Sequence, residues 1–349
     1  MPNPKSTSTD SERSEFYGRL APHSLAPLWE DIGNLLLREP APAAVPHLWR
    51  YEDVRPLLLE SGGLITAEEA ERRVLILENP ALPGNACATD TLYAGLQLIL
   101  PGEIAPAHRH TQSALRYIVE GTGAYTSVDG ERAYMDVGDL ILTPSWTWHD
   151  HGSDGDGPMV WLDGLDIPIL RFMTTMFTER YADPVYPESR PAGDSRARYG
   201  ANMLPVNGSW ASKTSPVFHY PYARSREALE KMRQAGDIDP YQGHKLEYIN
   251  PATGGAAMPT MSTFLQLLPK GFKSEPYRST DGAVYSVVEG SGKADIGGTE
   301  LTWSARDTFA VPAWMQHTLE AGEDSVLFSF SDRVMQQSLG LWREQRGNQ

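Results

Sequence analysis

The sequence predicts a mainly β protein built from two related barrels, and an internal duplication is the first reason. Residues 287–290 (VVEG) repeat residues 118–121 (IVEG) at an offset of 169. Residues 312–317 (PAWMQH) repeat residues 144–149 (PSWTWH) at an offset of 168. Such internal similarity indicates two copies of one structural unit. The second reason is Asp129-Gly130, which stands between two short alternating runs and is a strong signal for a β-hairpin.

We expect four parts along the chain. The first is a partly helical N-terminal extension over residues 1–85, and the second is the first barrel over residues 86–170. A linker with a long loop and a helix covers residues 171–255. The second barrel covers residues 256–349 and ends in a C-terminal helix, expected over residues 334–345.

Local patterns predict the helices of the extension and the linker. Apolar spacing, or a run of good helix formers, indicates helices over residues 24–38, 55–60, 66–71 and 225–235. Ser225 is the expected N-cap of the last of these helices, and Gly236 is its expected stop. Residues 1–15 are rich in Ser, Thr and charged side chains, so we expect them to lack regular structure.

Composition excludes several classes of function. The 349 residues carry a formal net charge of −15 and a pI near 5.0, which argues against nucleic acid or an anionic membrane as a partner. A single cysteine, Cys87, excludes an internal disulfide and suits a reducing compartment. The N-terminus lacks the apolar core of a signal peptide, and no apolar run approaches the ~20 residues that span a bilayer. We therefore expect a cytoplasmic protein.

Three histidines of the first repeat have the spacing of a metal site. His108 and His110 lie on one face of a strand, because side chains alternate along a strand. His149 follows a short strand and a proline turn, 39 residues after His110. A lone histidine on a strand is more often a core or surface residue, and an HxH pair also arises by chance. The third histidine makes a metal site the better interpretation.

The second repeat has lost most of this set. Tyr277 and Ser279 stand at the positions of His108 and His110, and only His317 remains. One imidazole does not hold a metal ion, so we expect the second barrel to be structural.

The first repeat resembles the two motifs of the cupins, which are small jelly-roll barrels. The motifs are Gly102-x5-His108-x-His110 and Gly138-x5-Pro144-x4-His149. With the duplication, the resemblance implies a bicupin of two jelly-roll barrels. The usual motif also has a Glu shortly after the second His, but residues 112–115 (QSAL) supply none. Three neutral imidazoles on an octahedral ion leave three positions open, enough for a bidentate anion and dioxygen. Three His with zinc and water form the alternative, a hydrolytic site.

Longer motifs narrow the family. Residues 71–75, 93–97, 106–116, 146–151 and 161–168 resemble the gentisate 1,2-dioxygenases, and the resemblance extends from about residue 25 to 345. It implies one iron(II) per chain, a homotetramer, and a place in the catabolism of aromatic compounds. The implied reaction inserts both atoms of O2 between the carboxyl-bearing and the hydroxyl-bearing ring carbons of gentisate (2,5-dihydroxybenzoate). The product is maleylpyruvate.

The resemblance also implies roles for single residues. The metal ligands are His108, His110 and His149; the catalytic residues are His151, Arg116 and Asp163; the substrate-binding residues are Arg72, Tyr93, Gln97, Arg116 and Trp161.

Sequence alone leaves an alternative for some of these residues. Arg72, like Arg73 beside it, could belong to a solvated helix face, and sequence alone favours that alternative. Arg116 follows His110 by six residues, so even spacing points both the same way if one strand continues unbroken. His151 could act as an acid/base or be a solvated loop residue.

Several functions remain open at this point. The main alternative is a dioxygenase for salicylate or 1-hydroxy-2-naphthoate, although Tyr93 favours gentisate because the salicylate-cleaving relatives carry Trp there. The others are a non-catalytic cupin that binds an aromatic acid or stores metal, and a zinc-dependent hydrolase. The residues do not select the metal, since imidazole binds iron, zinc, copper and nickel alike.

Overall fold

The computed structural model describes residues 9–207 and 212–347. The chain divides into two compact units, residues 1–41 and 42–349. In the described part of the first unit, the elements are α1 (Asp10–Leu20), η1 (Ala21–His23) and α2 (Leu28–Leu35).

Helix α1 corrects one expectation about the N-terminus. A capping box starts it: the Thr9 hydroxyl accepts from the Glu12 backbone N–H, and the Glu12 carboxylate accepts from the Thr9 backbone N–H. The expectation that residues 1–15 lack regular structure is therefore wrong for residues 10–15, and residues 1–8 lie outside the described residues. The polar composition hid a helix that begins with this cap.

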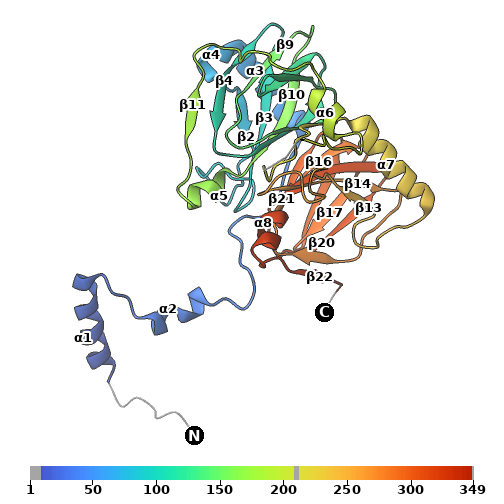
Figure 1. Ribbon diagram of the computed structural model, residues 1–349. Coiled ribbons are helices and arrows are strands. Elements are labelled where there is room, and N and C mark those ends of the chain that lie inside the picture. Colours follow the sequence, from blue (N-terminus) through green and yellow to red (C-terminus); the bar gives the residue numbers. More distant parts are fainter. Residues whose placement is uncertain (1–8, 208–211, 348–349) are drawn as a thin grey trace. The chain divides into compact units, whose positions relative to one another are not determined.

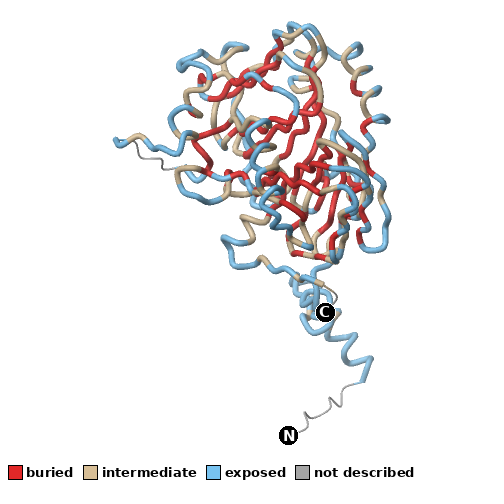
Figure 2. Tube along the Cα trace, turned by 90° about the vertical axis from the view of Figure 1, so that its right-hand side faces the viewer, coloured by how far each residue is buried: buried red, intermediate tan, exposed pale blue. Residues whose placement is uncertain are grey.

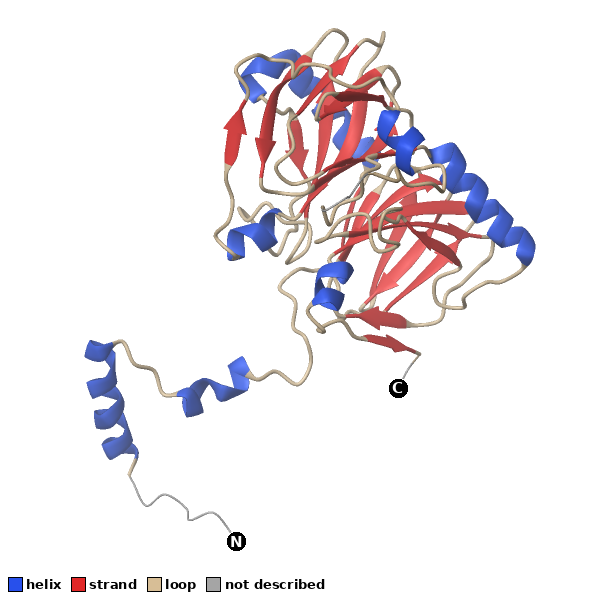
Figure 3. Cartoon of the chain, viewed as in Figure 1, coloured by secondary structure: helices blue, strands red, loops and turns tan. Residues whose placement is uncertain are grey.

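The second unit is mainly β, and its strands form two barrels, each made of two sheets (Figures 1 and 3). The first barrel has a six-stranded sheet in the order β12-β8-β5-β10-β3-β2 and a five-stranded sheet in the order β11-β4-β9-β6-β7. Its strands are β2 (Val74–Ile76), β3 (Tyr93–Ile99), β4 (Ile104–His110), β5 (Ala114–Glu120), β6 (Ala124–Val128), β7 (Glu131–Tyr134), β8 (Leu140–Thr143), β9 (His149–Ser153), β10 (Met159–Leu165), β11 (Thr178–Arg180) and β12 (His219–Tyr220).

The second barrel repeats this plan. Its sheets have the orders β1-β19-β16-β21-β14-β13 and β18-β17-β20-β15-β22. Its strands are β1 (His47–Trp49), β13 (His244–Glu247), β14 (Ser262–Leu268), β15 (Tyr277–Ser279), β16 (Ala283–Glu289), β17 (Ser291–Ile296), β18 (Thr299–Ser304), β19 (Thr308–Val311), β20 (His317–Ala321), β21 (Ser325–Ser331) and β22 (Glu344–Arg346).

Strands from outside the two expected barrel ranges complete the sheets. Strand β1 comes from the N-terminal extension, yet it pairs with β19 of the second barrel. Strands β11 and β12 pair with β4 and β8 of the first barrel. The linker and the extension are thus parts of the barrels' edges, and short-range patterns do not indicate such long-range pairing.

Both repeats turn their β-ribbon with the same tight geometry. Asp129 and Gly130 both have positive φ (47° and 80°) between β6 and β7, and Gly297 and Gly298 have φ of 59° and 84° between β17 and β18. Two central residues with positive φ form the hairpin turn that matches the twist of the strands. The hairpin expected at Asp129-Gly130 is confirmed.

The two barrels share one core. Buried residues concentrate in the interior of the second unit (Figure 2), and one cluster of buried apolar side chains includes residues of both barrels. At its centre the rings of Tyr117 on β5 and Phe328 on β21 stack with centroids 3.9 Å apart. Both side chains are almost fully buried, so the faces that meet are packed like a protein interior.

The helices of the second unit lie at the barrels' surface. They are α3 (Tyr51–Leu64), α4 (Ala67–Ala70), α5 (Ile167–Phe172), α6 (Asp194–Tyr199), α7 (Tyr222–Ala235) and α8 (Arg333–Ser338). The expected C-terminal helix is present but short: α8 ends at Ser338, and residues 344–346 form β22 against β15. None of the helices in the described residues is long and apolar enough to cross a membrane.

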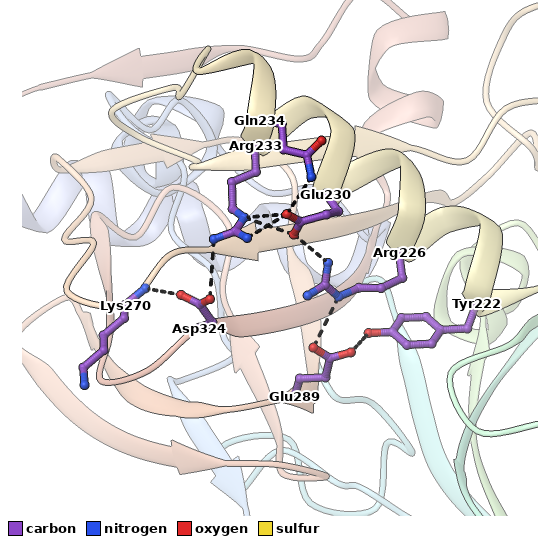
Figure 4. Close-up of polar contacts among 8 residues, drawn as sticks. All are labelled: Tyr222, Arg226, Glu230, Arg233, Gln234, Lys270, Glu289 and Asp324. Atoms are coloured by element: carbon purple, nitrogen blue, oxygen red, sulfur yellow. Dashed lines mark hydrogen bonds and ion pairs between the residues drawn. The ribbon is translucent and has the colours of Figure 1, made fainter.

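Helix α7 is fixed to the second barrel by polar contacts (Figure 4). Tyr222 and Arg226 both bind Glu289, and Arg233 lies 3.7 Å from Asp324. Gly236 ends the helix with a φ of 86°, as expected. The expected N-cap Ser225 is wrong, because the helix begins one turn earlier, after Pro221.

We expect Phe328→Ala to lower the free energy of unfolding by about 3–5 kcal/mol, because it leaves a cavity between the barrels and exposes one face of Tyr117. Denaturant unfolding measures the change. Phe172→Ala is the matched control, since Phe172 is 88% exposed, and we expect almost no change there. Equal effects of the two substitutions would contradict a shared core.

Candidate active site

Strands β4 and β9 bring three histidines together inside the first barrel. His108 pairs directly with His149 across the two strands, and His110 lies two residues further along β4. One potential ligand atom from each of the three rings lies within 4.8 Å of the others. Over residues 9–207 and 212–347, no other group of three His, Cys, Asp or Glu is arranged in this way. The structure therefore brings together the three residues that the spacing singled out.

Backbone carbonyls hold each ring at Nδ1. His108 contacts the Pro106 carbonyl at 3.2 Å, His110 the Gln112 carbonyl at 2.9 Å, and His149 the Thr147 carbonyl at 2.9 Å. A carbonyl accepts, so the Nδ1 atoms of His110 and His149 carry the proton and their Nε2 atoms keep a lone pair. Among the described residues, the buried Nε2 of His149 has no hydrogen-bond partner. These rings fit a divalent metal ion.

Burial keeps the three rings neutral. It lowers the pKa of His108 to about 2 and that of His110 to about 4, and it lowers the pKa of His149 well below its usual value. Nearby arginines act in the same direction. Neutral imidazole is the form that binds metal, so the ligand set is ready at neutral pH without loss of a proton.

Arg72 lies against His108. Helix α4 ends at Ala70, and its C-cap residue Glu71 has a φ of 53°, which turns the chain so that Arg72 points toward His108. The guanidinium donates to the carbonyls of Glu71 (2.7 Å) and Pro106 (2.9 Å), and its Nη2 lies beside the Nδ1 edge of His108. Burial and the charge of Arg116 lower the pKa of Arg72 to about 9. The alternative of a solvated arginine face is wrong for Arg72.

It is also wrong for Arg73, which is buried and pairs with Glu103 at 2.6 Å. The two neighbouring arginines thus bind different partners. Arg72 faces the histidines, and Arg73 anchors the start of β2 to the strand connection at Glu103.

Arg116 approaches the histidines from β5. It pairs across the strands with Asp163 on β10, with Nε and Oδ1 3.6 Å apart, and it donates to the Thr143 hydroxyl. Burial raises the pKa of Asp163 to about 6, although Arg116 opposes this shift. The condition of one unbroken strand is not met, because β4 ends at His110 and β5 begins at Ala114. Arg116 instead belongs to the other sheet of the first barrel.

Trp161 and Gln97 lie near this pair. The Trp161 indole donates to Asp163 Oδ1 at 3.1 Å, and Trp161 pairs with Gln97 across β10 and β3. Both side chains are buried. The indole therefore fixes the orientation of the carboxylate that faces Arg116.

His151 is on β9, is fully buried, and is not the solvated loop residue of the alternative. Its Nδ1 lies 2.9 Å from the Thr126 hydroxyl oxygen, and that hydroxyl can donate to the sulfur of Met135 at 3.3 Å. The Nε2 of His151 is buried and has no hydrogen-bond partner among the described residues. Burial lowers the pKa of His151 well below its usual value, so the ring is a neutral acceptor.

Tyr93 on β3 shows why a glycine is needed two residues later. A Cβ on Gly95 would lie 2.8 Å from the Tyr93 hydroxyl and 2.5 Å from Val74 Cγ1. Gly95 is a site residue that the sequence reasoning missed. Its signal was present, because a glycine inside a strand often marks the close approach of another group.

A cleft of about 350 Å³ leads to His108 from solvent. Its lining includes Glu68, Glu71, His108 and residues 180–184. Arg180 and Glu71 form an ion pair at this entrance. Sequence reasoning missed that pair too, because residues 71 and 180 are far apart in the chain.

The corresponding positions of the second barrel confirm the loss of the triad. Tyr277 on β15 pairs with His317 on β20, as His108 pairs with His149 in the first barrel. The ring centroids of Tyr277 and His317 lie 5.6 Å apart, and the rings pack edge to face. Ser279 stands at the third position.

Comparisons with known proteins agree with this site. Residues 95–165 match the cupin domain family. The chain is 57% identical over 335 residues to gentisate 1,2-dioxygenase 1 of Aquipseudomonas alcaligenes, with 96% of each chain covered. It is 37% identical to a gentisate 1,2-dioxygenase of a Streptomyces species, with 98% of each covered.

Among solved structures, the chain is similar to salicylate 1,2-dioxygenase of Pseudoaminobacter salicylatoxidans as an adduct with gentisate. The TM-score is 0.92 at 34% identity, and the match covers 100% of this chain and 96% of the other. The expected bicupin fold is confirmed, and the chain belongs to the gentisate 1,2-dioxygenase family of ring-cleaving dioxygenases.

Proposed function

We propose that this protein is an iron(II)-dependent dioxygenase that cleaves gentisate with O2 to maleylpyruvate in aromatic catabolism. The observation that carries the proposal is the cluster of three neutral imidazoles with Arg72 beside it, in a chain of this family. Both atoms of O2 enter the product, so the reaction balances with gentisate and O2 alone and needs no further reactant.

His108, His110 and His149 would hold the metal through their Nε2 atoms. A bound iron(II) would supply open coordination positions and a route for electrons between an aromatic ring and dioxygen. Iron is proposed over zinc because ring cleavage by O2 needs a metal that changes its oxidation state. A zinc-dependent hydrolase remains the alternative that these ligands also permit.

Arg72 and Arg116 suit the substrate's charge. Two guanidinium groups lie beside the neutral histidines, where Arg116 also pairs with Asp163. The chain as a whole carries −15, so the guanidinium donors of Arg72 and Arg116 are the groups that would attract an anionic ligand to this pocket. A guanidinium fork binds a carboxylate through two parallel hydrogen bonds and thereby fixes the ring's orientation.

His151 would accept a proton from a substrate hydroxyl. Its Nε2 has no partner among the described residues, and the 2.9 Å contact between Nδ1 and the Thr126 hydroxyl oxygen positions the ring. Asp163, held by the Trp161 indole, would keep the Arg116 guanidinium directed at the substrate. Tyr93 and Gln97 would line the pocket from β3.

A related substrate is the second candidate. A salicylate dioxygenase has the same fold, so salicylate or 1-hydroxy-2-naphthoate could take the place of gentisate. Tyr93 favours gentisate, because the salicylate-cleaving relatives carry Trp at this position. The phenol of Tyr93 is smaller than an indole, and its hydroxyl can form a hydrogen bond with the second hydroxyl of gentisate. A non-catalytic cupin that binds an aromatic acid is the candidate from another class.

We also propose a cytoplasmic homo-oligomer, with a tetramer as the expected form. Helix α2 exposes Leu28, Trp29, Ile32 and Leu35, and no residue of α1 or α2 is buried. Such a set of exposed apolar side chains suits burial against another copy of the chain. Sedimentation of the full chain measures the assembly, and a monomer would contradict it.

The first experiment loads iron(II) without air and then adds gentisate and air. We expect one O2 consumed per gentisate and a new absorbance from the ring-opened product. Consumption of O2 with salicylate or 1-hydroxy-2-naphthoate, but not with gentisate, would mean that one of these acids is the substrate instead. Bound metal with no uptake on any of the three acids would contradict a dioxygenase.

His108→Ala and His149→Ala should each abolish iron binding, because two imidazoles leave the ion without its third protein ligand. Metal analysis after loading and desalting measures the content. His317→Ala is the matched control, and we expect it to keep one iron per chain. Loss of iron in the control, or full occupancy in either variant of the first barrel, would contradict the assignment.

Arg72→Lys should lower kcat/KM for gentisate by about 30-fold, since a point charge replaces a fork that makes a charge-assisted pair worth about 2 kcal/mol. Steady-state kinetics with parallel iron analysis measures it, and iron content should not change. Arg198→Lys, an exposed arginine paired with Asp194, is the control and should keep the original rate. Equal kinetics in the two variants would exclude Arg72 from substrate binding.

A further inference from the structure

The second barrel encloses a small polar cavity where the first barrel has its histidines. The cavity measures about 20 Å³. Its lining includes Lys245, Tyr277, Asp281, Tyr285, His317 and Arg333. Tyr277 and His317 stand at the positions of two metal ligands, and Tyr285 follows Arg116 by the repeat offset of 169.

Lys245 is the unusual member of this set. It lies on β13 opposite Gln266 of β14, just as Val74 on β2 lies opposite Gln97 of β3 in the first barrel. The second repeat therefore places an ammonium group at the strand position where the first has the apolar Val74.

The ammonium of Lys245 has no hydrogen-bond or ion-pair partner among the described residues. It lies over the rings of Phe264, at 4.7 Å, and Tyr285, at 5.7 Å. Burial, with the nearby Arg333, lowers the pKa of Lys245 to about 7. The Tyr285 hydroxyl likewise makes no hydrogen bond within the described part of the chain, although Tyr285 is only 5% exposed.

The nearest carboxylate is already used by other groups. Asp281 pairs with Arg333 (3.3 Å) and accepts from the Trp342 indole (2.7 Å). Burial alone would raise the pKa of Asp281, but Arg333 and its hydrogen bonds lower it, so it is ionised. Two cations thus face one carboxylate, which leaves a surplus of one positive charge when Lys245 is protonated.

The other groups around the cavity do not remove this surplus. The Tyr277 hydroxyl donates to Glu344, and Glu247 on β13 is exposed. Asp239 already pairs with Arg346 at 2.9 Å. His317 is neutral, since burial lowers its pKa to about 4. A half-buried ammonium that lacks an anionic partner is costly, so an anion in the cavity would stabilise the folded chain.

We propose that the second barrel binds a small monovalent anion, such as chloride, between Lys245, Arg333 and the Tyr285 hydroxyl. The volume admits about one water-sized ligand, which excludes an aromatic acid. A cation is excluded as the ligand by the two positive side chains and by the single imidazole. The second barrel thus keeps the binding position of the first but reverses the charge of its ligand.

The test compares chloride with gluconate, which is too large for the cavity, at equal ionic strength on the full metal-loaded chain. We expect chloride to raise the Tm by about 2 °C or more, because a ligand that binds only the folded state stabilises it. Lys245→Met should lose this response. Lys231→Met, which changes an exposed lysine of α7, should keep it. An unchanged response in Lys245→Met would overturn the proposal.

A second measurement uses the unaltered chain, so it holds even if Lys245→Met fails to fold. Crystals grown in bromide should show an anomalous peak in the cavity beside Lys245. A cavity that holds only water at saturating bromide would overturn the proposal. A peak confined to the first barrel would do the same, because it would assign the chloride response to the histidine site.

Discussion

The removal of three imidazoles from water is the constraint on which the site depends. Inside the barrel the charged form of each ring is disfavoured, so His108, His110 and His149 are neutral. Backbone carbonyls accept from Nδ1 of His110 and His149 and leave their Nε2 atoms available to a metal ion. No side-chain carboxylate is needed to orient the rings. The strand backbone of β4 and β9 therefore determines both the position and the protonation state of the ligands.

Because the ligands are neutral, the charge balance of the pocket is set by other residues. Arg72 and Arg116 bring two positive charges, and Asp163 offsets part of them. Both guanidinium groups are partly destabilised by burial, and an anionic substrate would restore the solvation that they lost. The same arrangement that makes the pocket costly when empty thus favours binding of an aromatic carboxylate.

Local patterns predicted the triad and the hairpin at Asp129-Gly130, because the first depends on the alternation of a strand and the second on turn residues with positive φ. They did not predict Arg72, whose entry into the barrel follows from the positive φ of Glu71 rather than from any periodicity. His151 was equally undetermined, since its burial requires Thr126 and Trp161 from other strands. Edge strands such as β1 and β12 also escaped prediction, because their partners lie far away in the sequence.

The duplication explains why one barrel can lose its metal ligands without losing its fold. The hairpin geometry, the strand order and the core between Tyr117 and Phe328 do not involve the lining of either barrel. The lining of the second barrel was therefore free to change. Fixed cations on Lys245 and Arg333 now occupy the region where the first barrel holds neutral ligands. A charge inside a barrel must be compensated by a partner of opposite sign. In the first barrel neutral imidazoles would hold a cation, and in the second barrel the cationic side chains would hold an anion.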